Sequence, residues 1–224
     1  MKKSMLRTIG VSLALVLLLA GGQALALDTV VGETETYLDA ARENIRTKET
    51  TAGNLVIDAM REVSGADIGI TNGGGIREAI EAGPITLEDV LTLLPFENSV
   101  VTIELTGAEV WATLEHAVSQ FPALWGGFPQ VSNIVFTFDA GKPAGERVVE
   151  VLFGGEPIDP EATFVVVTNG FLTSGGDGFE MLMKDTLEDF GDMQEILIGY
   201  LQENSPVAPE VEGRIIQIGE PVEE

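Results

Sequence analysis

The chain has 224 residues, which is enough for one domain with a core of its own. Its 36 acidic and 12 basic residues give a formal net charge of −24, and a field of that sign repels nucleic-acid backbones and anionic membrane surfaces. The absence of cysteine excludes disulfides, and the single histidine, His116, excludes a zinc or dinuclear hydrolase site within the chain, because such sites use several imidazoles.

The N-terminus has the pattern of an export signal. Three basic residues within 2–7 precede an apolar run over 9–20, and Ala24-Leu25-Ala26 matches a small-x-small cleavage site. We expect cleavage after Ala26 and an exported protein, periplasmic or extracellular, with one domain over 27–218 and an acidic tail over 219–224. An uncleaved anchor is the alternative, but an apolar run this short spans a bilayer poorly.

Removal of the signal would make the chain more acidic. It takes away three basic residues and leaves nine Lys and Arg against 36 Asp and Glu, a net charge of −27. We therefore expect no nucleic-acid partner and, after cleavage, no membrane partner. A saline habitat is a second explanation of the acidity. Where cations are this scarce, an arginine that follows three glycines, as Arg77 does, is informative.

A helix and a strand are predicted before the first glycine-rich turn. Residues 28–47 are polar and indicate an extended arm with a short helix over 37–46. Apolar residues then share one helical face over 54–63, and Gly65 is placed to end that helix. A strand over 67–71 leads directly into the turn that begins at Asn72.

A capping pattern marks the next helix. Thr86 is its N-cap, with Asp89 three residues on, and Leu94-Pro95 ends it because the residue before a proline avoids helical dihedrals. Phe96 is therefore expected on a loop just past this helix.

A half-buried strand and a second capped helix are predicted next. Residues 101–105 alternate with period two, and Thr106 and Glu109 form a capping box for a helix over 107–120. The apolar stripe of that helix leaves His116 on its flank. We therefore interpret His116 as a surface or boundary residue rather than as part of a Ser-His-Asp triad.

The second half of the sequence is mostly strand. Runs over 133–138 and 147–153 flank a Gly- and Pro-containing turn and predict a hairpin, and a third run covers 163–168. An amphipathic helix is predicted over 193–201 and a last strand over 214–218. Because helices and strands are mixed rather than alternating, the expected fold class is α+β, with a mixed β-sheet covered by helices.

Several side chains beside glycines suit a phosphorylated, base-bearing small molecule. The glycines of Asn72-Gly73-Gly74-Gly75 follow a strand, so they would free backbone N–H groups and admit a ligand, and Arg77 would hold phosphate in a bidentate fork. A plain strand-to-helix turn is the alternative.

Two phenylalanines and an aspartate complete this set. Phe96 and Phe171 are each either a stacking platform or a core plug. Asp177, between Gly176 and Gly178, is either an acceptor for paired sugar hydroxyls or a turn-forming residue. The sequence has no G-x-x-x-x-G-K-[ST] and no G-x-S-x-G, and we expect no catalytic residue among these side chains.

Four motifs occur in a fixed order along the chain. They are Gly53-Asn54-Leu55-Val56-Ile57-Asp58-Ala59, Asn72-Gly73-Gly74-Gly75-Ile76-Arg77, Leu94-Pro95-Phe96 and Phe171-Leu172-Thr173-Ser174-Gly175-Gly176-Asp177-Gly178-Phe179. Together they closely resemble the C-terminal domain of the 5′-nucleotidase family, which includes UDP-sugar hydrolases and 2′,3′-cyclic-nucleotide phosphodiesterases. The resemblance covers about residues 30–218 and implies the fold of that domain.

The resemblance also implies a role for each residue. Phe96 and Phe171 would sandwich the base of a nucleotide or nucleoside, Asn72 would bond its edge, Asp177 would hold the ribose hydroxyls and Arg77 would meet phosphate. Lys48 aligns with a phosphate-binding arginine, and a lysine keeps the charge but loses the bidentate fork. The expected substrate-binding set is Arg46, Lys48, Asn72, Gly74, Gly75, Arg77, Phe96, Phe171, Gly176 and Asp177.

In that family a separate N-terminal metallophosphoesterase domain holds two divalent metals and cleaves the substrate. No such segment precedes residue 30, so we expect no cofactor in this chain and no hydrolysis of phosphate esters by it alone. Three hypotheses follow: an exported nucleotide- or nucleoside-binding module in nucleotide scavenging, one chain of a split 5′-nucleotidase with a metallophosphoesterase partner, or a degenerate fragment of structural value only. The presence of all five principal site residues disfavours the third.

Overall fold

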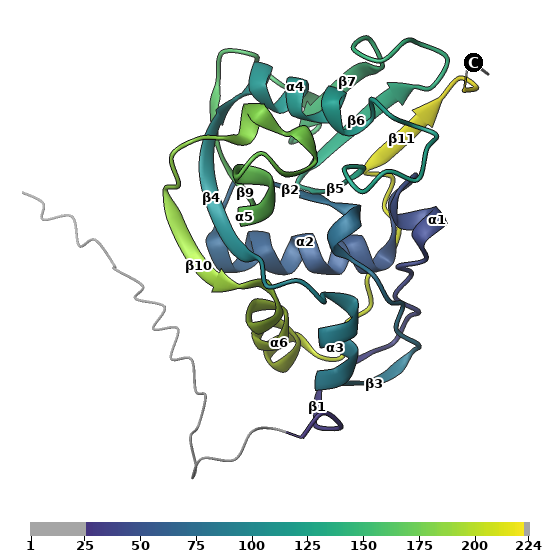
Figure 1. Ribbon diagram of the computed structural model, residues 1–224, viewed down its shortest axis with the longest axis vertical. Helices are drawn as coiled ribbons and strands as arrows, with labels where there is room; N and C mark the ends of the chain where they lie inside the picture. Colours follow the sequence, from purple (N-terminus) through teal and green to yellow (C-terminus); the bar gives the residue numbers. More distant parts are fainter. Residues whose placement is uncertain (1–25, 222–224) are drawn as a thin grey trace, which may run out of the picture.

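The structure is a computed structural model that describes residues 26–221 (Figure 1). Residues 1–25 of the predicted signal peptide, and the last three residues of the predicted acidic tail, lie outside the described residues. Within residues 26–221, no helix is both long enough and apolar enough to cross a membrane.

A five-stranded mixed sheet forms the centre of the molecule. Its spatial order is β10-β4-β9-β2-β5. β2 and β9 run parallel, with Ile68 opposite Val166, and the other neighbouring pairs are antiparallel. The strands are β2 (Ile68–Asn72), β4 (Ser99–Thr106), β5 (Pro129–Ser132), β9 (Thr163–Asn169) and β10 (Glu188–Asp192). This mixed sheet confirms the α+β prediction.

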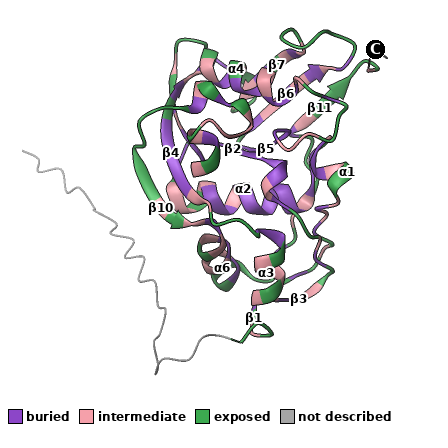
Figure 2. Cartoon of the chain, in the orientation of Figure 1, coloured by how far each residue is buried: buried purple, intermediate pink, exposed green. Residues whose placement is uncertain are grey.

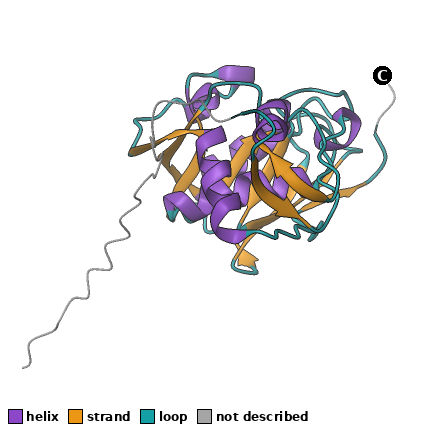
Figure 3. Ribbon diagram, turned by 90° about the horizontal axis from the view of Figure 1, so that it is seen from below, coloured by secondary structure: helices purple, strands orange, loops and turns teal. Residues whose placement is uncertain are grey.

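Two layers cover the two faces of this sheet, and the buried positions lie between the layers (Figure 2). One layer consists of the helices α2 (Thr51–Ser64), α3 (Leu87–Leu93) and α6 (Met193–Asn204). The other consists of α4 (Gly107–Ala117) and a four-stranded sheet of order β11-β6-β7-β8. Those strands are β6 (Ile134–Asp139), β7 (Val148–Phe153), β8 (Glu156–Pro157) and β11 (Ile215–Ile218). Figure 3 shows helices lying against the strands from a second direction.

Because both faces of the central sheet are covered, its strands are more buried than alternation predicts. On β9, the adjacent residues Val166 and Val167 are both buried but belong to two different apolar clusters, one on each side of the sheet. β4 was predicted to be half-buried. Within its middle part only Glu104 is exposed, and even Thr102 is buried. That prediction was therefore wrong, since it assumed a solvated face.

Local chemistry explains where the helices begin and end. The hydroxyl of Thr50 accepts a hydrogen bond from the N–H of Gly53 at 3.1 Å, so α2 begins at Thr51, three residues before the predicted start. Gly65, with φ of 63°, ends this helix in the left-handed conformation. The capping boxes predicted at Thr86 and Thr106 are both formed, and α4 ends at Ala117 rather than at residue 120.

The hairpin and the C-terminal strand also form where the sequence places them. β6 and β7 pair antiparallel, which confirms the predicted hairpin, and β11 runs parallel to β6. The arm before α2 contains β1 (Val30–Thr34), which pairs with β3 (Gly83–Thr86), and a single helical turn, α1 (Arg42–Ile45). That turn is much shorter than the helix predicted over 37–46.

A buried carboxylate ties the C-terminal segment to the start of α2. Glu49 is only 4% exposed, and it accepts hydrogen bonds from the backbone N–H groups of Glu212, Gly213 and Arg214 at 2.7, 2.8 and 2.7 Å. The side chain of Asn54 donates to it as well, at 2.6 Å. We call this arrangement the Glu49 latch. It positions the segment that leads into β11.

Candidate functional site

The segments that carry the predicted site residues converge at one edge of the central sheet. β2 ends at Asn72 and continues into the 3-10 turn η1 (Gly73–Gly75), while β9 ends at Asn169 and continues into α5 (Gly170–Thr173). Because β2 and β9 are parallel neighbours, their carboxyl ends emerge side by side. The turn η2 (Gly176–Gly178) then brings Asp177 to the same place.

Asn72 lies at the centre of a short chain of side-chain hydrogen bonds. The N–H of Leu172 donates to Asn169 Oδ1 at 3.1 Å, and this bond sets which way the Asn169 amide points. Asn169 Nδ2 then donates to Asn72 Oδ1 at 3.0 Å and to Thr71 Oγ1 at 2.9 Å. Asn72 Nδ2 consequently faces Asp177 and donates to its Oδ2 at 3.3 Å. Asn72 is 5% exposed, so its amide is held in one orientation.

Asn169 was not predicted as a site residue, although a local signal was present. It is the N-cap of α5, and an asparagine just before Gly170 and Phe171 is a typical helix start. Its second role, as the donor to Asn72, depends on a residue 97 positions away and is visible only in the structure.

The glycines after Asn72 serve loop packing rather than an open anion cradle. The N–H of Gly73 donates to the carbonyl of Phe128 and the N–H of Gly74 to that of Gly126, both at 2.7 Å. A Cβ on Gly74 would lie 2.7 Å from Gly126 Cα, so the two loops touch because Gly74 lacks a side chain. The prediction that these glycines free their N–H groups is therefore wrong for Gly73 and Gly74.

Gly75 differs from the two glycines before it. Within 4 Å, a Cβ built on Gly75 would meet only Asn72 Oδ1, at 3.7 Å. This part of the turn is therefore open beside the buried amide of Asn72.

Asp177 lies in a turn with an uncommon backbone. Its φ is 51°, and the nearby Gly175 and Gly178 have φ of 83° and 75°. Left-handed dihedrals are uncommon for a residue other than glycine, although aspartate tolerates them better than most. The carbonyl of Asp177 contacts His116 Nε2 at 2.9 Å, and its half-buried carboxylate faces Asn72.

The two predicted aromatic platforms are both accessible. Phe96 is 44% exposed and Phe171 is 42% exposed, which removes the core-plug alternative for each. The guanidinium carbon of Arg77 lies 5.0 Å from the centre of the Phe96 ring, a cation–π distance. Arg77 therefore lies next to an exposed ring of the predicted site.

Two arginines act on a third, buried arginine at this edge. Arg46 is 8% exposed and donates from Nη1 to the carbonyl of Leu124 at 3.0 Å. Its burial, and then the positive charges of Arg42 and Arg77, lower the pKa of Arg46, while the negative charge of Asp177 opposes the change. Arg42 was not predicted. The available signal was its spacing, four residues before Arg46 on a helical turn.

Lys48, which the alignment of motifs predicts as a phosphate ligand, is not among the charges that act on Arg46. Its side chain is exposed, and its carbonyl accepts a hydrogen bond from Gln130 Nε2 at 2.8 Å. Gly176 packs against Phe171, since a Cβ there would lie about 2.5 Å from the ring. Within residues 26–221, no group of three or more potential ligands among His, Cys, Asp and Glu is arranged to hold a metal ion.

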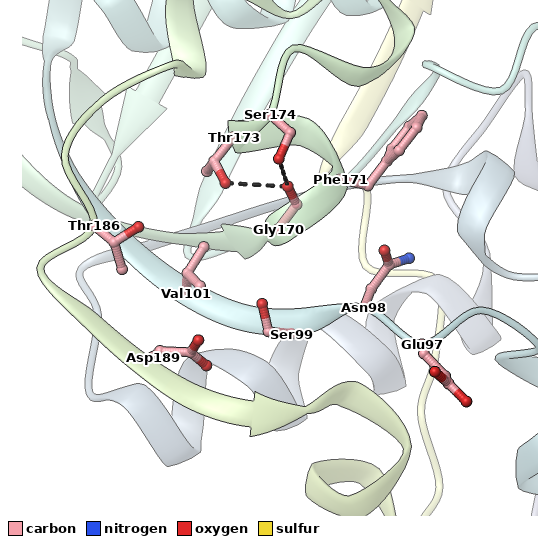
Figure 4. A pocket seen from close by; sticks show the side chains of 10 residues that line it. All are labelled: Glu97, Asn98, Ser99, Val101, Gly170, Phe171, Thr173, Ser174, Thr186 and Asp189. Carbon is pink, nitrogen blue, oxygen red and sulfur yellow. Dashed lines mark hydrogen bonds between the residues drawn. The ribbon is translucent and has the colours of Figure 1, made fainter.

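A shallow hollow of about 510 Å³ adjoins this edge (Figure 4). Its lining comes from β4, α5, β10 and the loops next to them, and it consists mostly of hydroxyl, amide and carboxylate side chains. Phe171 is its one residue in common with the predicted site, and in Figure 4 the ring points away from Val101, Thr186 and Asp189. The hollow is therefore a neighbour of the predicted site and not the site itself.

Comparisons of this chain with known proteins all point to one family. The model of the 5′-nucleotidase C-terminal domain matches residues 30–184. The chain is 40% identical to the trifunctional nucleotide phosphoesterase protein YfkN of Bacillus subtilis, over 84% of this chain and 14% of that protein. It is 37% identical to protein UshA of Escherichia coli, over 81% of this chain and 32% of that protein.

A solved structure supports the same conclusion. The 5′-nucleotidase precursor from Thermus thermophilus superposes with a TM-score of 0.81 and 39% identity, over 86% of this chain and 40% of that one. The chain spans less than half the length of each of these relatives. Sequence and fold agree, and the chain belongs to the 5′-nucleotidase C-terminal domain family.

Proposed function

We propose that this domain binds a nucleotide or nucleoside and takes part in nucleotide catabolism or scavenging as an exported protein. The observation that carries the proposal is the hydrogen-bond chain from Asn169 through Asn72 to Asp177. It presents an oriented amide and a carboxylate beside two exposed phenylalanines and a group of arginines. In a nucleotide, the amide suits the edge of the base and the aromatic rings suit its face. The carboxylate suits the sugar, and the guanidinium groups suit the phosphate.

The base would stack between Phe96 and Phe171. Exposed rings are available to a ligand, and stacking on an aromatic side chain contributes about 1 to 3 kcal/mol per base and tolerates different bases. The cation–π contact of Arg77 holds one face of Phe96, so the other face is the one offered to the base. Asn72 has a second amide hydrogen beyond the one directed at Asp177, which suits a hydrogen-bond acceptor on the base edge.

The sugar and phosphate would bind Asp177 and the arginines. Asp177 accepts one hydrogen bond from Asn72 at the rather long distance of 3.3 Å, which leaves acceptor capacity for a ribose diol. Arg42, Arg46 and Arg77 are three of only 12 basic residues, yet the charges of Arg42 and Arg77 both act on Arg46 at one edge of a chain of net charge −24. An anionic phosphate there would relieve the mutual repulsion of the arginines.

Titration calorimetry with adenosine and AMP tests this proposal. The unmodified protein should bind both, and combining Phe96→Ala with Phe171→Ala should weaken adenosine binding by more than tenfold, since two rings at about 1 to 3 kcal/mol each are lost. Ile216→Ala, which truncates another exposed apolar side chain, on β11 of the other sheet, is the matched control and should keep the affinity of the unmodified protein. Absence of binding by the unmodified protein at millimolar ligand would refute the proposal, and an unchanged affinity in the double variant would remove the stacking.

A second candidate is a subunit of a split 5′-nucleotidase. The observation in its favour is that the chain covers 32% of UshA and 40% of the Thermus protein, so it corresponds to one part of each. In this case the domain would select the nucleotide and a separate metallophosphoesterase chain would cleave it. Mixing the two chains should produce AMP hydrolysis that neither gives alone, and an Asp177→Ala chain should fail to restore it. Equal rates with and without this chain would exclude a split enzyme.

A further inference from the structure

The only histidine of the chain contacts the turn that presents Asp177. His116 lies on α4, in the layer opposite the main helices, and is half-buried. Its Nε2 lies 2.9 Å from the backbone carbonyl oxygen of Asp177. A carbonyl oxygen can only accept a hydrogen bond, so Nε2 carries the hydrogen and donates it. The sequence alone predicts a surface or boundary residue on the flank of this helix, with no role at the site.

Two aromatic rings hold the imidazole in place. Trp125 and Phe179 stand nearly parallel, 4° apart, with ring centres separated by 6.1 Å. The imidazole meets both edge-on, at 5.3 Å and 84° from Trp125 and at 4.6 Å and 82° from Phe179. These contacts fix the plane of the imidazole and direct its N–H at the Asp177 carbonyl.

The same contacts join the three loops of the site. Trp125 immediately precedes Gly126, whose carbonyl accepts the hydrogen bond from Gly74. Phe179 ends the turn that contains Asp177, and a Cβ on Gly178 would lie 3.4 Å from two imidazole atoms. His116 is therefore packed against the Asp177 turn on one side and the Gly126 loop on the other.

We infer that His116 is a positioning residue that holds Asp177 in its left-handed backbone conformation. It thereby fixes the position of the Asp177 carboxylate, which receives the ribose diol. Asp177 has φ of 51°, an uncommon value that needs support from its surroundings. The hydrogen bond from His116 anchors the peptide group that follows Asp177, while Asn72 contacts the carboxylate. Both ends of Asp177 are thus held. The inference rests on the proposed function, because it concerns the same ribose contact.

Two variants test separately the hydrogen-bond donor and the aromatic ring of His116. His116→Phe keeps an aromatic ring against Trp125 and Phe179 but has no hydrogen-bond donor. His116→Gln keeps an N–H the same number of bonds from Cα, so it can still donate to the Asp177 carbonyl. The ligands are adenosine and 2′,3′-dideoxyadenosine, which differ only in the ribose hydroxyls.

The ratio of the two affinities is the decisive readout. In His116→Phe the preference for adenosine should fall about three- to tenfold, the loss of one hydrogen bond, with dideoxyadenosine affinity unchanged. His116→Gln should retain most of the preference. In an Asp177→Ala background, His116→Phe should cause no further change in the ratio. Equal weakening of both nucleosides by His116→Phe would mean general damage and would overturn the inference.

Hydrogen exchange provides a readout that needs no ligand. In His116→Phe, amides within 175–179 should exchange at least several-fold faster than in the unmodified protein, whereas those of β9 should not change. Unchanged exchange at 175–179 would overturn the inference. If the unmodified protein binds neither nucleoside, the proposed function fails and this inference fails with it. If it binds both and His116→Phe leaves their ratio unchanged, the proposed function stands and the inference alone fails.

Discussion

Replacing Glu49 by glutamine keeps the length of the side chain, removes its charge and breaks the Glu49 latch. In the structure each carboxylate oxygen accepts two hydrogen bonds: Oε1 from Asn54 and the N–H of Glu212, and Oε2 from the N–H groups of Gly213 and Arg214. Glutamine has only one such oxygen. Whichever way its amide turns, two of these donors face an NH₂ group that cannot accept.

The expected loss follows from those two bonds. A hydrogen bond to a charged acceptor contributes about 1.5 to 3 kcal/mol, so two of them cost about 3 kcal/mol at the lower limit. For a domain of this size, 1 kcal/mol lowers the melting temperature by about 2 to 4 °C, so Glu49→Gln should melt about 6 to 12 °C lower. Burial supports the full cost, because Glu49 is 4% exposed and water cannot replace the lost partners.

Urea unfolding followed by tryptophan fluorescence measures this free energy, with hydrogen exchange at residues 212–214 as a local check. Glu203→Gln is the matched control, because Glu203 is exposed on α6, and its stability should stay within about 0.5 kcal/mol of the unmodified protein. A loss below about 1 kcal/mol in Glu49→Gln would refute the reasoning, since it would mean that the latch contributes less than one ordinary hydrogen bond.

Two further predictions concern charge. Arg42→Met should weaken AMP binding at least tenfold while sparing adenosine, and should do so more than Lys48→Met, because the positive charge of Arg42 acts on the buried Arg46 and that of Lys48 does not. Calorimetry with both ligands compares the two variants, and a larger effect at Lys48 would reverse the assignment. The hydrogen bond that Glu109 accepts from Lys184, and then the capping bond that it accepts from the backbone N–H of Thr106, lower the pKa of Glu109 below its usual 4.5. The charged form of Glu109 therefore stabilises the fold above pH 4.5, and this stabilisation is lost as the pH falls through the lower pKa of the folded state. Glu109→Gln should therefore have a lower melting temperature than the unmodified protein, by a constant difference above pH 5 and by a shrinking difference toward pH 3. A difference in melting temperature that grows on acidification would contradict this.

Features with a local cause could be predicted from the sequence. The capping boxes at Thr86 and Thr106 each involve residues three positions apart, and both form as expected. The β6-β7 hairpin likewise needs only two β-rich runs and a turn.

Features that depend on distant partners could not be predicted in this way. β10 reads Glu-Asp-Phe-Gly-Asp, with no alternation of apolar residues, and it is a strand because its backbone pairs with β4 at the sheet edge. Similarly, Asn72 and Asp177 are 105 residues apart, and only the motif resemblance suggested that they share a site. The roles of Asn169 and His116 became visible only from the contacts that these residues make in the structure.

The parallel pairing of β2 with β9 has a consequence for how this domain tolerates change. Asn72 and Asn169 are adjacent because the two strand backbones run in register within the central sheet, so their alignment depends on that sheet and not on the length of the loops outside it. Insertions in the turn between β6 and β7 should leave that alignment intact, since this turn belongs to the other sheet. It is therefore a suitable place for a single engineered cysteine, which in a chain without any other would accept one label at one position.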